Sequence, residues 1–465
     1  MERNRAYFFC GIGGSGMLPL ALILKDKRHP VSGSDRARDQ GRTPEKFAFL
    51  EGQGIGLFPQ DGSGVTSPDT TVVISTAVED TIPDVQAAKR AGAQLITRAQ
   101  LLAELFNAAP LGIGVAGTSG KSTTTGMIGW ILQSTGRDPT IMNGAVMNNL
   151  ITEKQLFASA RVGKGEIFVS EVDESDGSIT HYNPGIAVLN NVTLDHKAID
   201  ELRILFRDFL AKAKTAVMNW DDAETRALAR TLPSEKMLSY SLSDTTATLR
   251  AVDIKPSPGG IAFVVNDRTS RVALSLRVPG RHNVANALAA LATVRACGIT
   301  LSQAAKALEG FTGIRRRLEV VGSANGITVI DDFAHNPDKI AATLATLHDF
   351  PGRLLIMFQP HGFGPLKLMK TGFIDVFGNE LARGDVLIMP DPVYFGGTVE
   401  RSVSSEDVVA GVRAKGRAAH AFVERTQCGE KLLELARPGD RIVVMGARDD
   451  TLSTFAAGLL AKLQT

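Results

Sequence analysis

The seven residues Gly117-Thr118-Ser119-Gly120-Lys121-Ser122-Thr123 constrain the fold of this chain more than any other segment. They follow a short apolar run, Leu111–Val115, and they precede an apolar stretch of helical spacing, Gly126–Gln133. Glycines let backbone N–H groups curl around phosphate oxygens, and a helix that follows directs its positive dipole end at them. The segment therefore predicts an α/β domain with a phosphate-binding loop.

Two residues of this loop are expected to carry chemistry. Lys121 would reach the β and γ phosphates of a nucleotide, and Ser122 would hold Mg²⁺ through its hydroxyl. The general pattern has a glycine five residues before Gly120, where this chain has Val115. The alternative is a glycine turn that caps a helix beside an unrelated lysine. The strand before the turn and the helix after it favour phosphate binding.

Other short apolar runs are typical of buried parallel strands, with helix-length patterns between them. Breaks are expected near Asn107–Pro110 and Gly310–Gly313, and residues 245–278 predict strands without helices, in an antiparallel patch. A chain of 465 residues is long enough for two or three domains. The predicted strands are Tyr7–Cys10, Val72–Ile74, Ile167–Val169, Ile186–Leu189, Ile327–Ile330, Leu354–Met357, Val386–Met389 and Ile442–Met445.

Four carboxylates follow the predicted strand Ile167–Val169, in the order Glu171, Asp173, Glu174 and Asp176. Such a cluster at a strand end needs a positive partner, and Mg²⁺ prefers oxygen ligands. We expect Glu171 to be the metal ligand. A solvated acidic loop is the alternative.

A histidine follows the next predicted strand, Ile186–Leu189. His196 stands beside Asp195, at the edge of the sheet where α/β proteins bind their ligands. It is a candidate ligand for the metal or a phosphate. A satisfied polar or core histidine is the alternative.

A second glycine turn, Gly11–Gly16, lies between the strand Tyr7–Cys10 and an apolar helix. It predicts a second anion cradle, with a tight turn that binds nothing as the alternative. Three arginines, Arg315–Arg317, follow the second predicted break. They would either form a solvated basic face or place guanidinium groups on a transferring phosphate.

Composition narrows the class of protein. A net charge of +2 at pH 7 is too small to favour binding to nucleic acid or to a membrane surface. No apolar stretch of the sequence is long enough to span a bilayer. The chain has three cysteines, Cys10, Cys297 and Cys428. Their number excludes a disulfide framework, their spacing argues against a thiolate metal site, and they are expected to be reduced core residues. We expect a cytoplasmic protein that is a monomer or a homodimer.

The ordered set of motifs is similar to that of the Mur ligase family along nearly the whole chain. The motifs are GTSGKST, EVDESD, LNNVTLDH, PGRHNVANALAA, RRRLEV, DDFAHNPDKIAATL and FQPH. The resemblance implies an α/β fold of three domains: a Rossmann-like domain at residues 1–108 that binds a UDP-sugar, a P-loop domain at 109–312 that binds ATP, and a Rossmann-like domain at 313–465 that closes on ATP and the amino acid. The two outer domains would contain parallel sheets.

The resemblance also assigns roles to matching residues. Catalytic roles fall on Lys121, Glu171, His196 and Arg317, and the magnesium ligands would be Ser122, Glu171 and His196. The ATP contacts would be Gly117, Thr118, Ser119, Gly120, Lys121, Ser122, Thr123, His282, Asn283, Asn286, Arg316, Arg317 and Asp332, with Asp332 on the ribose. The UDP-sugar contacts would be Gly11, Gly13, Gly14, Ser15, Gly16, Met17 and Asp35.

The activity that the resemblance implies is ATP-dependent amide ligation. The lactyl carboxylate of UDP-N-acetylmuramate would be joined to the amine of L-alanine through an acyl phosphate, with ATP and Mg²⁺ as cofactors. The N-terminal GIGGSGM resembles the branch that adds L-alanine, whereas HYNPGIAVLNN and DDFAHNP resemble the branch that adds a recycled L-alanyl-γ-D-glutamyl-diaminopimelate. A protein that binds a UDP-sugar without ligating it is the alternative from another class.

Departures from the family pattern gather in the third domain. Asn336 stands in place of a second histidine, and FQPH continues as GFGPLK rather than as a run rich in arginine and threonine. In the P-loop, Ser119 replaces a common histidine. The identity of the amine therefore stays open, and His335 is a candidate for the general base.

Overall fold

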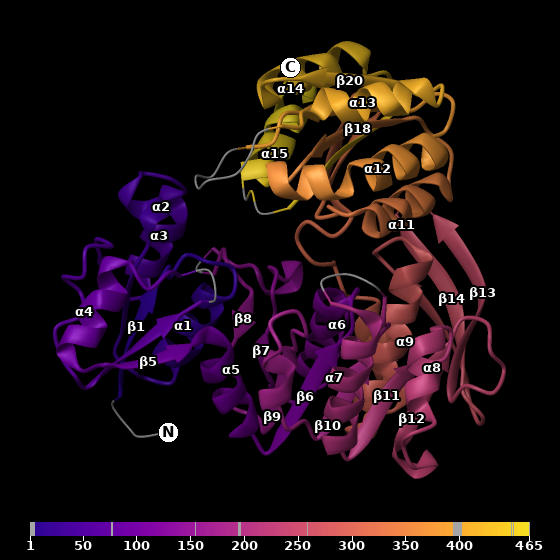
Figure 1. Ribbon diagram of the computed structural model, residues 1–465. Helices are drawn as coiled ribbons and strands as arrows, with labels where there is room; N and C mark the ends of the chain where they lie inside the picture. Colours follow the sequence, from indigo (N-terminus) through magenta and orange to yellow (C-terminus); the bar gives the residue numbers. More distant parts are fainter. Residues whose placement is uncertain are drawn as a thin grey trace. The chain divides into compact units, whose positions relative to one another are not determined.

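The computed structural model describes residues 5–75, 78–153, 155–193, 197–257, 259–393, 402–447, 449 and 451–464. These residues form three sheets (Figure 1). It divides into two compact units. The first unit comprises Met1–Ile254, Ala262–Arg277 and Asn283–Thr312, and the second comprises Lys255–Ile261, Val278–His282 and Gly313–Thr465.

The first sheet is parallel and has the strand order β3-β2-β1-β4-β5. Side chains alternate between its two faces: Tyr7 and Phe9 of β1 enter the core beneath α1, α3 and α5, while Phe8 packs with α4. The strands are β1 Ala6–Cys10, β2 Val31–Ser34, β3 Gly56–Phe58, β4 Thr70–Ile74 and β5 Gln94–Thr97. The helices are α1 Met17–Asp26, α2 Arg36–Asp39, α3 Pro44–Gly52, α4 Pro83–Ala91 and α5 Arg98–Asn107.

The central sheet has the order β15-β14-β13-β12-β11-β10-β6-β9-β7-β8. Strands β6 and β9 to β12 pair in parallel, and β8 is antiparallel to β7. The strands are β6 Leu111–Ala116, β7 Thr140–Met142, β8 Ala160–Arg161, β9 Ile167–Glu171, β10 Ile186–Leu189, β11 Thr215–Asn219, β12 Met237–Ser241, β13 Leu249–Ser257, β14 Gly260–Asn266 and β15 Arg271–Leu276. The helices are α6 Lys121–Ser134, α7 Ile199–Lys212, α8 Ala223–Ala229, α9 Arg281–Ala296 and α10 Leu301–Leu308, with 3₁₀ turns at η1 Asn148–Leu150, η2 Ser178–His181 and η3 Ser234–Lys236.

Two glycines of β6 make room for aromatic side chains. A Cβ at Gly112 would lie 2.5 Å from the Phe106 ring, and one at Gly114 would lie 2.9 Å from the Phe209 ring. Larger residues would therefore push α5 and α7 away from the strand that leads into the P-loop. The strand patch expected over residues 245–278 is formed by β13, β14 and β15, which lie side by side in chain order.

The third sheet has the order β16-β17-β21-β18-β19-β20, and only β16 is antiparallel to its neighbour. Helices α11, α12 and α13 pack on one face, and α14 and α15 pack on the other (Figure 1). The strands are β16 Glu319–Ala324, β17 Ile327–Asp332, β18 Leu354–Gln359, β19 Val386–Pro390, β20 Ala418–Phe422 and β21 Arg441–Gly446. The helices are α11 Pro337–His348, α12 Phe363–Glu380, α13 Ser405–Ala414, α14 Arg425–Leu435 and α15 Thr451–Gln464. The three-domain α/β fold is as predicted.

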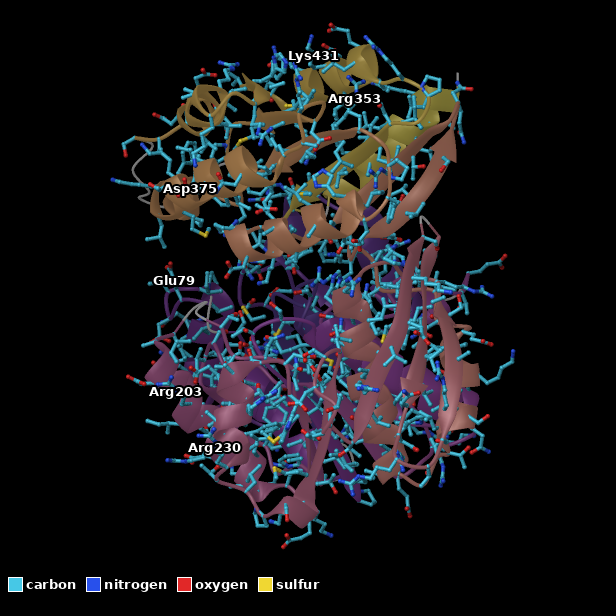
Figure 2. The ribbon with its side chains drawn as sticks, turned by 90° about the vertical axis from the view of Figure 1, so that its right-hand side faces the viewer. Glu79, Arg203, Arg230, Arg353, Asp375 and Lys431 are labelled. Atoms are coloured by element: carbon cyan, nitrogen blue, oxygen red, sulfur yellow. The ribbon has the colours of Figure 1, made fainter. Side chains whose placement is uncertain are left out.

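Charged side chains of both signs cover the surface of each unit, as for Glu79 and Arg203 in the first and Asp375 and Lys431 in the second (Figure 2). Many are paired locally; Arg203, for example, lies 2.6 Å from Glu224. In the part of the chain that the structure describes, no helix is both long enough and apolar enough to cross a bilayer. Cys10 and Cys428 are buried as expected, whereas Cys297 is only half-buried.

Candidate active site

The P-loop joins β6 to α6 through two glycines in the left-handed region. Gly117 has φ +124° and Gly120 has φ +82°, conformations that strain residues with a side chain. Space is also short, because a Cβ at Gly120 would lie 2.5 Å from Asn286 Oδ1. The local backbone therefore requires glycine at both positions. Helix α6 begins at Lys121, whereas the sequence predicted helical spacing only from Gly126.

Asparagines from neighbouring elements hold the loop in place. Asn191 Oδ1 accepts hydrogen bonds of 2.8 Å from both Thr118 Oγ1 and the Ser119 amide. Asn190 Nδ2 donates to Thr124 Oγ1 at 3.0 Å, and Thr124 Oγ1 donates to Asn286 Oδ1 at 3.2 Å. Asn190 and Asn191 follow β10, which pairs with β6, so the sheet order brings them to the loop. Neither Asn190 nor Asn191 was predicted from the sequence to contact the loop.

Lys121 lies inside the loop and is paired with an acidic residue. Its Nζ donates to the Gly117 carbonyl at 2.7 Å and lies 3.0 Å from Glu174 Oε2. Burial disfavours the ammonium, but Glu174 and Asp173 outweigh this effect and raise the pKa of Lys121. Lys121 is therefore a fixed positive charge at the mouth of the loop.

The acidic segment places its carboxylates around Lys121. Burial raises the pKa of Glu174 despite the nearby ammonium. Burial also raises the pKa of Asp173. The charge of Lys121 and the hydrogen bonds from the Ser175 amide and hydroxyl outweigh burial, so the pKa of Asp173 is lowered. Glu171 is the last residue of β9, and its Oε1 accepts a 2.6 Å hydrogen bond from the Gly144 amide.

The predicted metal ligands are only partly described. Ser122 is buried in the first turn of α6. Glu171 is the last residue of β9, and β6 separates β9 from β10 in the central sheet. His196 and its neighbour Asp195 lie outside the described residues. Within the described ranges, no three His, Cys, Asp or Glu residues are grouped to hold a metal ion. A hydroxyl and one carboxylate nevertheless fit Mg²⁺, which keeps several waters and takes phosphate oxygens.

The first glycine loop, residues 11–16, is tied to the strand beside it. The amides of Gly11 and Ile12 donate to the Ser34 carbonyl at 2.8 and 2.9 Å. Asp35 Oδ2 accepts from the Gly13 amide at 2.8 Å, while Oδ1 caps α2 through the Ala37 amide. The structure therefore brings Asp35 to the loop, as the predicted UDP-sugar site requires. Gly14, Ser15, Gly16 and Met17 complete the turn into α1.

In the second unit, Arg316 and Arg317 lie in different environments. The Arg316 guanidinium is buried and donates to Asp331, the Gly446 carbonyl and the Asp449 carbonyl at 3.3, 2.7 and 3.2 Å. The Arg317 guanidinium stacks on the Phe333 ring, 4.4 Å from its centre. Arg316 thus holds its own domain together, and the predicted phosphate contact depends mainly on Arg317.

Of the remaining predicted nucleotide contacts, Asp332, Asn283 and Asn286 are buried, whereas His282 is exposed. Asp332 accepts from the Leu318 amide at 2.9 Å and from Thr343 Oγ1 at 2.7 Å. His282 Nδ1 lies 3.3 Å from Thr346 Oγ1. Asn283 and Asn286 are joined by a 3.1 Å side-chain hydrogen bond in α9.

His335, the candidate general base, lies between two aromatic rings. Its ring centre is 5.3 Å from that of Phe333 and 5.2 Å from that of His361. Burial, with the positive charge of Lys339, lowers the pKa of His335 to about 4. Its Nδ1 lies 2.9 Å from the Phe333 carbonyl, so a neutral ring would donate there. At neutral pH His335 is a weak base.

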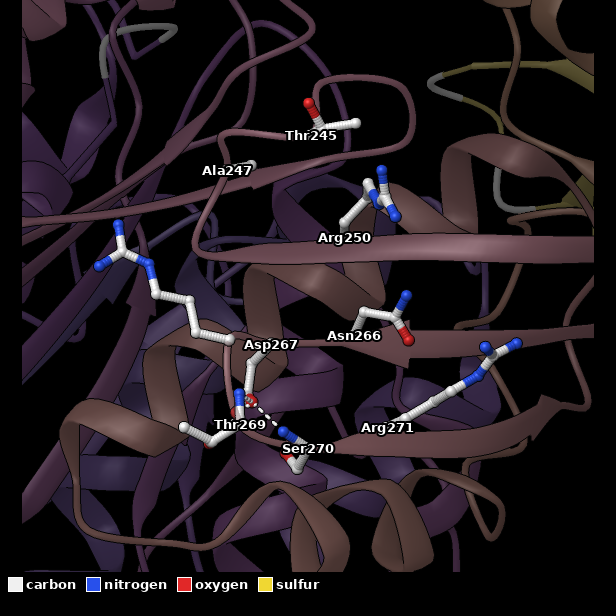
Figure 3. Close-up of a pocket in the computed structure, with 9 residues that line it drawn as sticks. Thr245, Ala247, Arg250, Asn266, Asp267, Thr269, Ser270 and Arg271 are labelled. Atoms are coloured by element: carbon white, nitrogen blue, oxygen red, sulfur yellow. Dashed lines mark hydrogen bonds between the residues drawn. The ribbon is translucent and has the colours of Figure 1, made fainter.

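A pocket of about 440 Å³ lies away from both loops, on the strand patch (Figure 3). Its lining includes Arg250, Asn266 and Arg271, with the Arg250 and Asn266 side chains facing one another (Figure 3). Arg271 is paired with Asp253 at 2.6 Å. The pocket shares no residue with either glycine loop.

Family models match three consecutive parts of the chain. Residues 6–109 match "Mur ligase family, catalytic domain", residues 115–294 match "Mur ligase middle domain", and residues 316–448 match "Mur ligase, glutamate ligase domain". The chain belongs to the Mur ligase family.

Named relatives of this Mur ligase extend over its full length. It is 36% identical to UDP-N-acetylmuramate–L-alanine ligase of Geobacter sulfurreducens, with 98% of this chain and 97% of the relative covered. It is 34% identical to the enzyme of the same name from Microcystis aeruginosa, with 96% and 93% covered.

Solved structures show the same fold. UDP-N-acetylmuramate-alanine ligase MurC of Thermotoga maritima aligns with a TM-score of 0.80 at 24% identity, with 98% of each chain covered. A murein peptide ligase of Psychrobacter arcticus aligns with a TM-score of 0.72 at 24% identity, with 99% of each covered.

Proposed function

We propose that this Mur ligase uses ATP and Mg²⁺ to join the lactyl carboxylate of UDP-N-acetylmuramate to the amine of L-alanine. The observation that carries the proposal is the pair of glycine loops in one compact unit, one beside Asp35 and one around Lys121. Two loops suit two nucleotides, and the full-length relatives named as L-alanine ligases support this substrate pair.

In the first step, the carboxylate attacks the γ-phosphorus of ATP, and ADP leaves. Lys121 would exchange its contact with Glu174 for the phosphate oxygens, and its fixed charge would offset the charge that develops there. Ser122, Glu171 and the predicted His196 would hold Mg²⁺, which neutralises phosphate charge when bound. Arg317 would add a guanidinium from the third domain.

In the second step, the amine attacks the acyl carbon of the acyl phosphate. The tetrahedral intermediate collapses to the amide and inorganic phosphate, and the ammonium proton is lost. Because an acyl phosphate is hydrolysed by water, the third domain would close over it. His335 is a poor base at neutral pH, because burial lowers its pKa to about 4, so it is not the residue that we propose to take the proton of the amine.

The recycled tripeptide is the second candidate for the amine. A solved ligase of this kind from Neisseria meningitides is 25% identical and aligns over 68% of this chain, with a TM-score of 0.59. L-Alanine and the tripeptide present the same alanine amine, so one chemistry serves both. The product distribution in a competition between them decides which is the substrate.

Phosphate release tests the proposal. Purified protein with ATP, Mg²⁺, UDP-N-acetylmuramate and L-alanine should release phosphate and form the amide, and omission of the sugar nucleotide should abolish both. Binding of the sugar nucleotide without phosphate release from ATP, across L-alanine and the tripeptide, would instead indicate a binding protein.

A further inference from the structure

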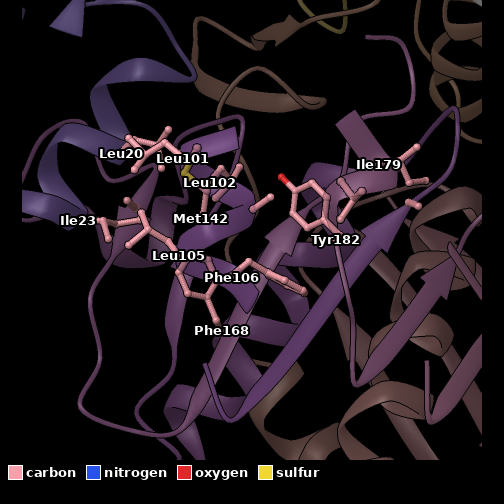
Figure 4. Packing of buried hydrophobic residues seen from close by; sticks show 14 of the residues in the cluster. Leu20, Ile23, Leu101, Leu102, Leu105, Phe106, Met142, Phe168, Ile179 and Tyr182 are labelled. Carbon is pink, nitrogen blue, oxygen red and sulfur yellow. The ribbon is translucent and has the colours of Figure 1, made fainter. Parts of the chain in front are cut away.

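Helix α5 is shared by the first two sheets of the chain. Its apolar side chains Leu101, Leu102, Leu105 and Phe106 pack in one core with residues of the central sheet (Figure 4). The ring of Phe106 lies 5.2 Å from that of Tyr182. The helix therefore joins the domain with the first glycine loop to the domain with the P-loop through apolar packing.

Each end of α5 also makes a polar contact with the central domain. At its C-terminal end, Asn107 Nδ2 donates to the His181 carbonyl at 2.8 Å, and Asn107 Oδ1 accepts from the Asn183 amide at 2.8 Å. At its N-terminal end, Arg98 Nη2 lies 3.6 Å from Asp176 Oδ2. A capping box between Thr97 and Gln100 fixes Arg98 as the first residue of the helix.

Arg98 also packs against the first glycine loop. A Cβ at Gly16 would lie 2.8 Å from Arg98 Cδ and 3.2 Å from Nε and Nη1, so only glycine lets the arginine lie there. Gly16 is the N-cap of α1. One guanidinium therefore touches the loop proposed for the UDP-sugar and faces the segment that carries the proposed metal ligand.

The acidic side of this contact is fixed as well. Asp176 Oδ1 accepts a 2.9 Å hydrogen bond from the Ser178 amide, which orients the carboxylate. Arg98 and Asp176 are largely shielded, with side-chain exposures of 24% and 19%. Shielding reduces screening by salt and makes such a pair more effective than one on an open surface.

We propose that Arg98 is a positioning residue that, through Asp176, holds glycine loop 11–16 in register with acidic segment 171–176. The inference rests on the proposed function and deepens it. The carboxylate of the UDP-sugar must come within reach of the γ-phosphorus, and the two are bound by different domains. Misplacement of reacting groups by about 1 Å can reduce a rate by about 100-fold. The position of glycine loop 11–16 relative to acidic segment 171–176 therefore sets the rate of acyl phosphate formation.

Steady-state kinetics of Arg98→Ala tests this role. The expected result is a fall in kcat of at least about 10-fold, with the KM for ATP changed by less than about twofold, because the P-loop itself is intact. Asp176→Asn should reproduce the loss of kcat, and the double variant Arg98→Ala/Asp176→Asn should be little worse than either single variant, since both changes remove one contact.

Asn107→Ala is the matched control, because it removes the polar contact at the other end of the same helix. It should keep kcat within about twofold of the wild-type value. Equal losses of kcat in Arg98→Ala and Asn107→Ala would overturn the inference, as would an unchanged kcat in Arg98→Ala or full additivity in the double variant.

Two outcomes separate this inference from the proposed function. Wild-type protein that releases no phosphate with UDP-N-acetylmuramate overturns both, whereas active wild type with an unaffected Arg98→Ala overturns the inference alone. If Arg98→Ala does not fold, Asp176→Asn and Arg98→Lys carry the test. Arg98→Lys should recover part of kcat, because lysine keeps the charge without the planar fork.

Discussion

Lys121 is the residue on which the proposed chemistry depends most. Its ammonium is held by the Gly117 carbonyl and Glu174, so it is charged and in place before a nucleotide arrives. Lys121→Met keeps the length of the side chain and removes the charge. We expect phosphate release to fall by at least about 100-fold, as when one stabilising donor is lost from an active site. Lys89→Ala, at an exposed side chain of α4, should leave the rate unchanged.

Two glycines at opposite ends of α6 allow steric clash and backbone strain to be separated. Gly120 combines φ +82° with a Cβ position only 2.5 Å from Asn286 Oδ1, whereas Gly136 has φ +78° and open space. Gly136→Ala should cost about 1 kcal/mol of unfolding free energy, from strain alone. Gly120→Ala should cost roughly 1–3 kcal/mol more and weaken ATP binding. Chemical denaturation and ATP titration measure the two effects, and equal costs would contradict this assignment.

The depressed pKa of His335 predicts a pH dependence of stability. The folded protein holds this imidazole with a pKa of about 4, below the ordinary value of about 6.5 in the unfolded chain. The unfolded state therefore binds more protons between these values. Stability from this group is complete above pH 6.5 and is lost as pH falls towards 4, by up to about 3 kcal/mol.

His335→Asn should flatten this part of the stability profile. Denaturation midpoints measured between pH 4 and 7 provide the comparison, with the exposed His181→Asn as the control. An unchanged slope in His335→Asn would show that another group is responsible.

At the scale of elements, α5 joins the first and central sheets in one core, which contains Phe106. This ring is fully buried between Phe168, Tyr182 and Gly112. Phe106→Ala should reduce stability by about 3–5 kcal/mol, because a large cavity forms where the first and central sheets meet. Differential scanning calorimetry measures the loss. Leu368→Ala, at a side chain that is 86% exposed, should have almost no effect.

The elements themselves were largely predictable from apolar runs. Strand Ile186–Leu189 has the predicted bounds, and the run Ile442–Met445 gains one residue at each end. The predicted strand Ile327–Ile330 extends to Asp332, so the carboxylates of Asp331 and Asp332 lie within β17. Periodicity could not reveal this, because these carboxylates are buried against partners distant in sequence, Arg316 and Thr343 among them.

The sequence predicts the loop residues whose role follows from residue type and from the backbone of one short segment, as at Gly117, Gly120 and Lys121. The site was not predictable where the order of strands decides which residues meet. Asn190 and Asn191 support the P-loop only because β10 pairs with β6. Likewise, no local pattern indicates that Arg98 would lie between Gly16 and Asp176.

At the scale of the whole molecule, the fold is that of a three-domain Mur ligase. We propose that its domains are residues 1–108, 109–312 and 313–465, which bind the UDP-sugar, ATP and the incoming amine with ATP, respectively. The motifs of the third domain that depart from the family pattern, Asn336 and the segment after FQPH, are where we expect the choice between L-alanine and the tripeptide to be made.

The central claim is that a carboxylate oxygen of the sugar nucleotide attacks ATP. UDP-N-acetylmuramate labelled with ¹⁸O in its lactyl carboxylate, incubated with the protein, ATP, Mg²⁺ and L-alanine, tests it directly by mass spectrometry of the phosphate released. The account predicts one ¹⁸O atom in each phosphate from a doubly labelled carboxylate, because the acyl phosphate oxygen leaves with phosphorus when the amine attacks. Amide product accompanied by unlabelled phosphate would contradict it.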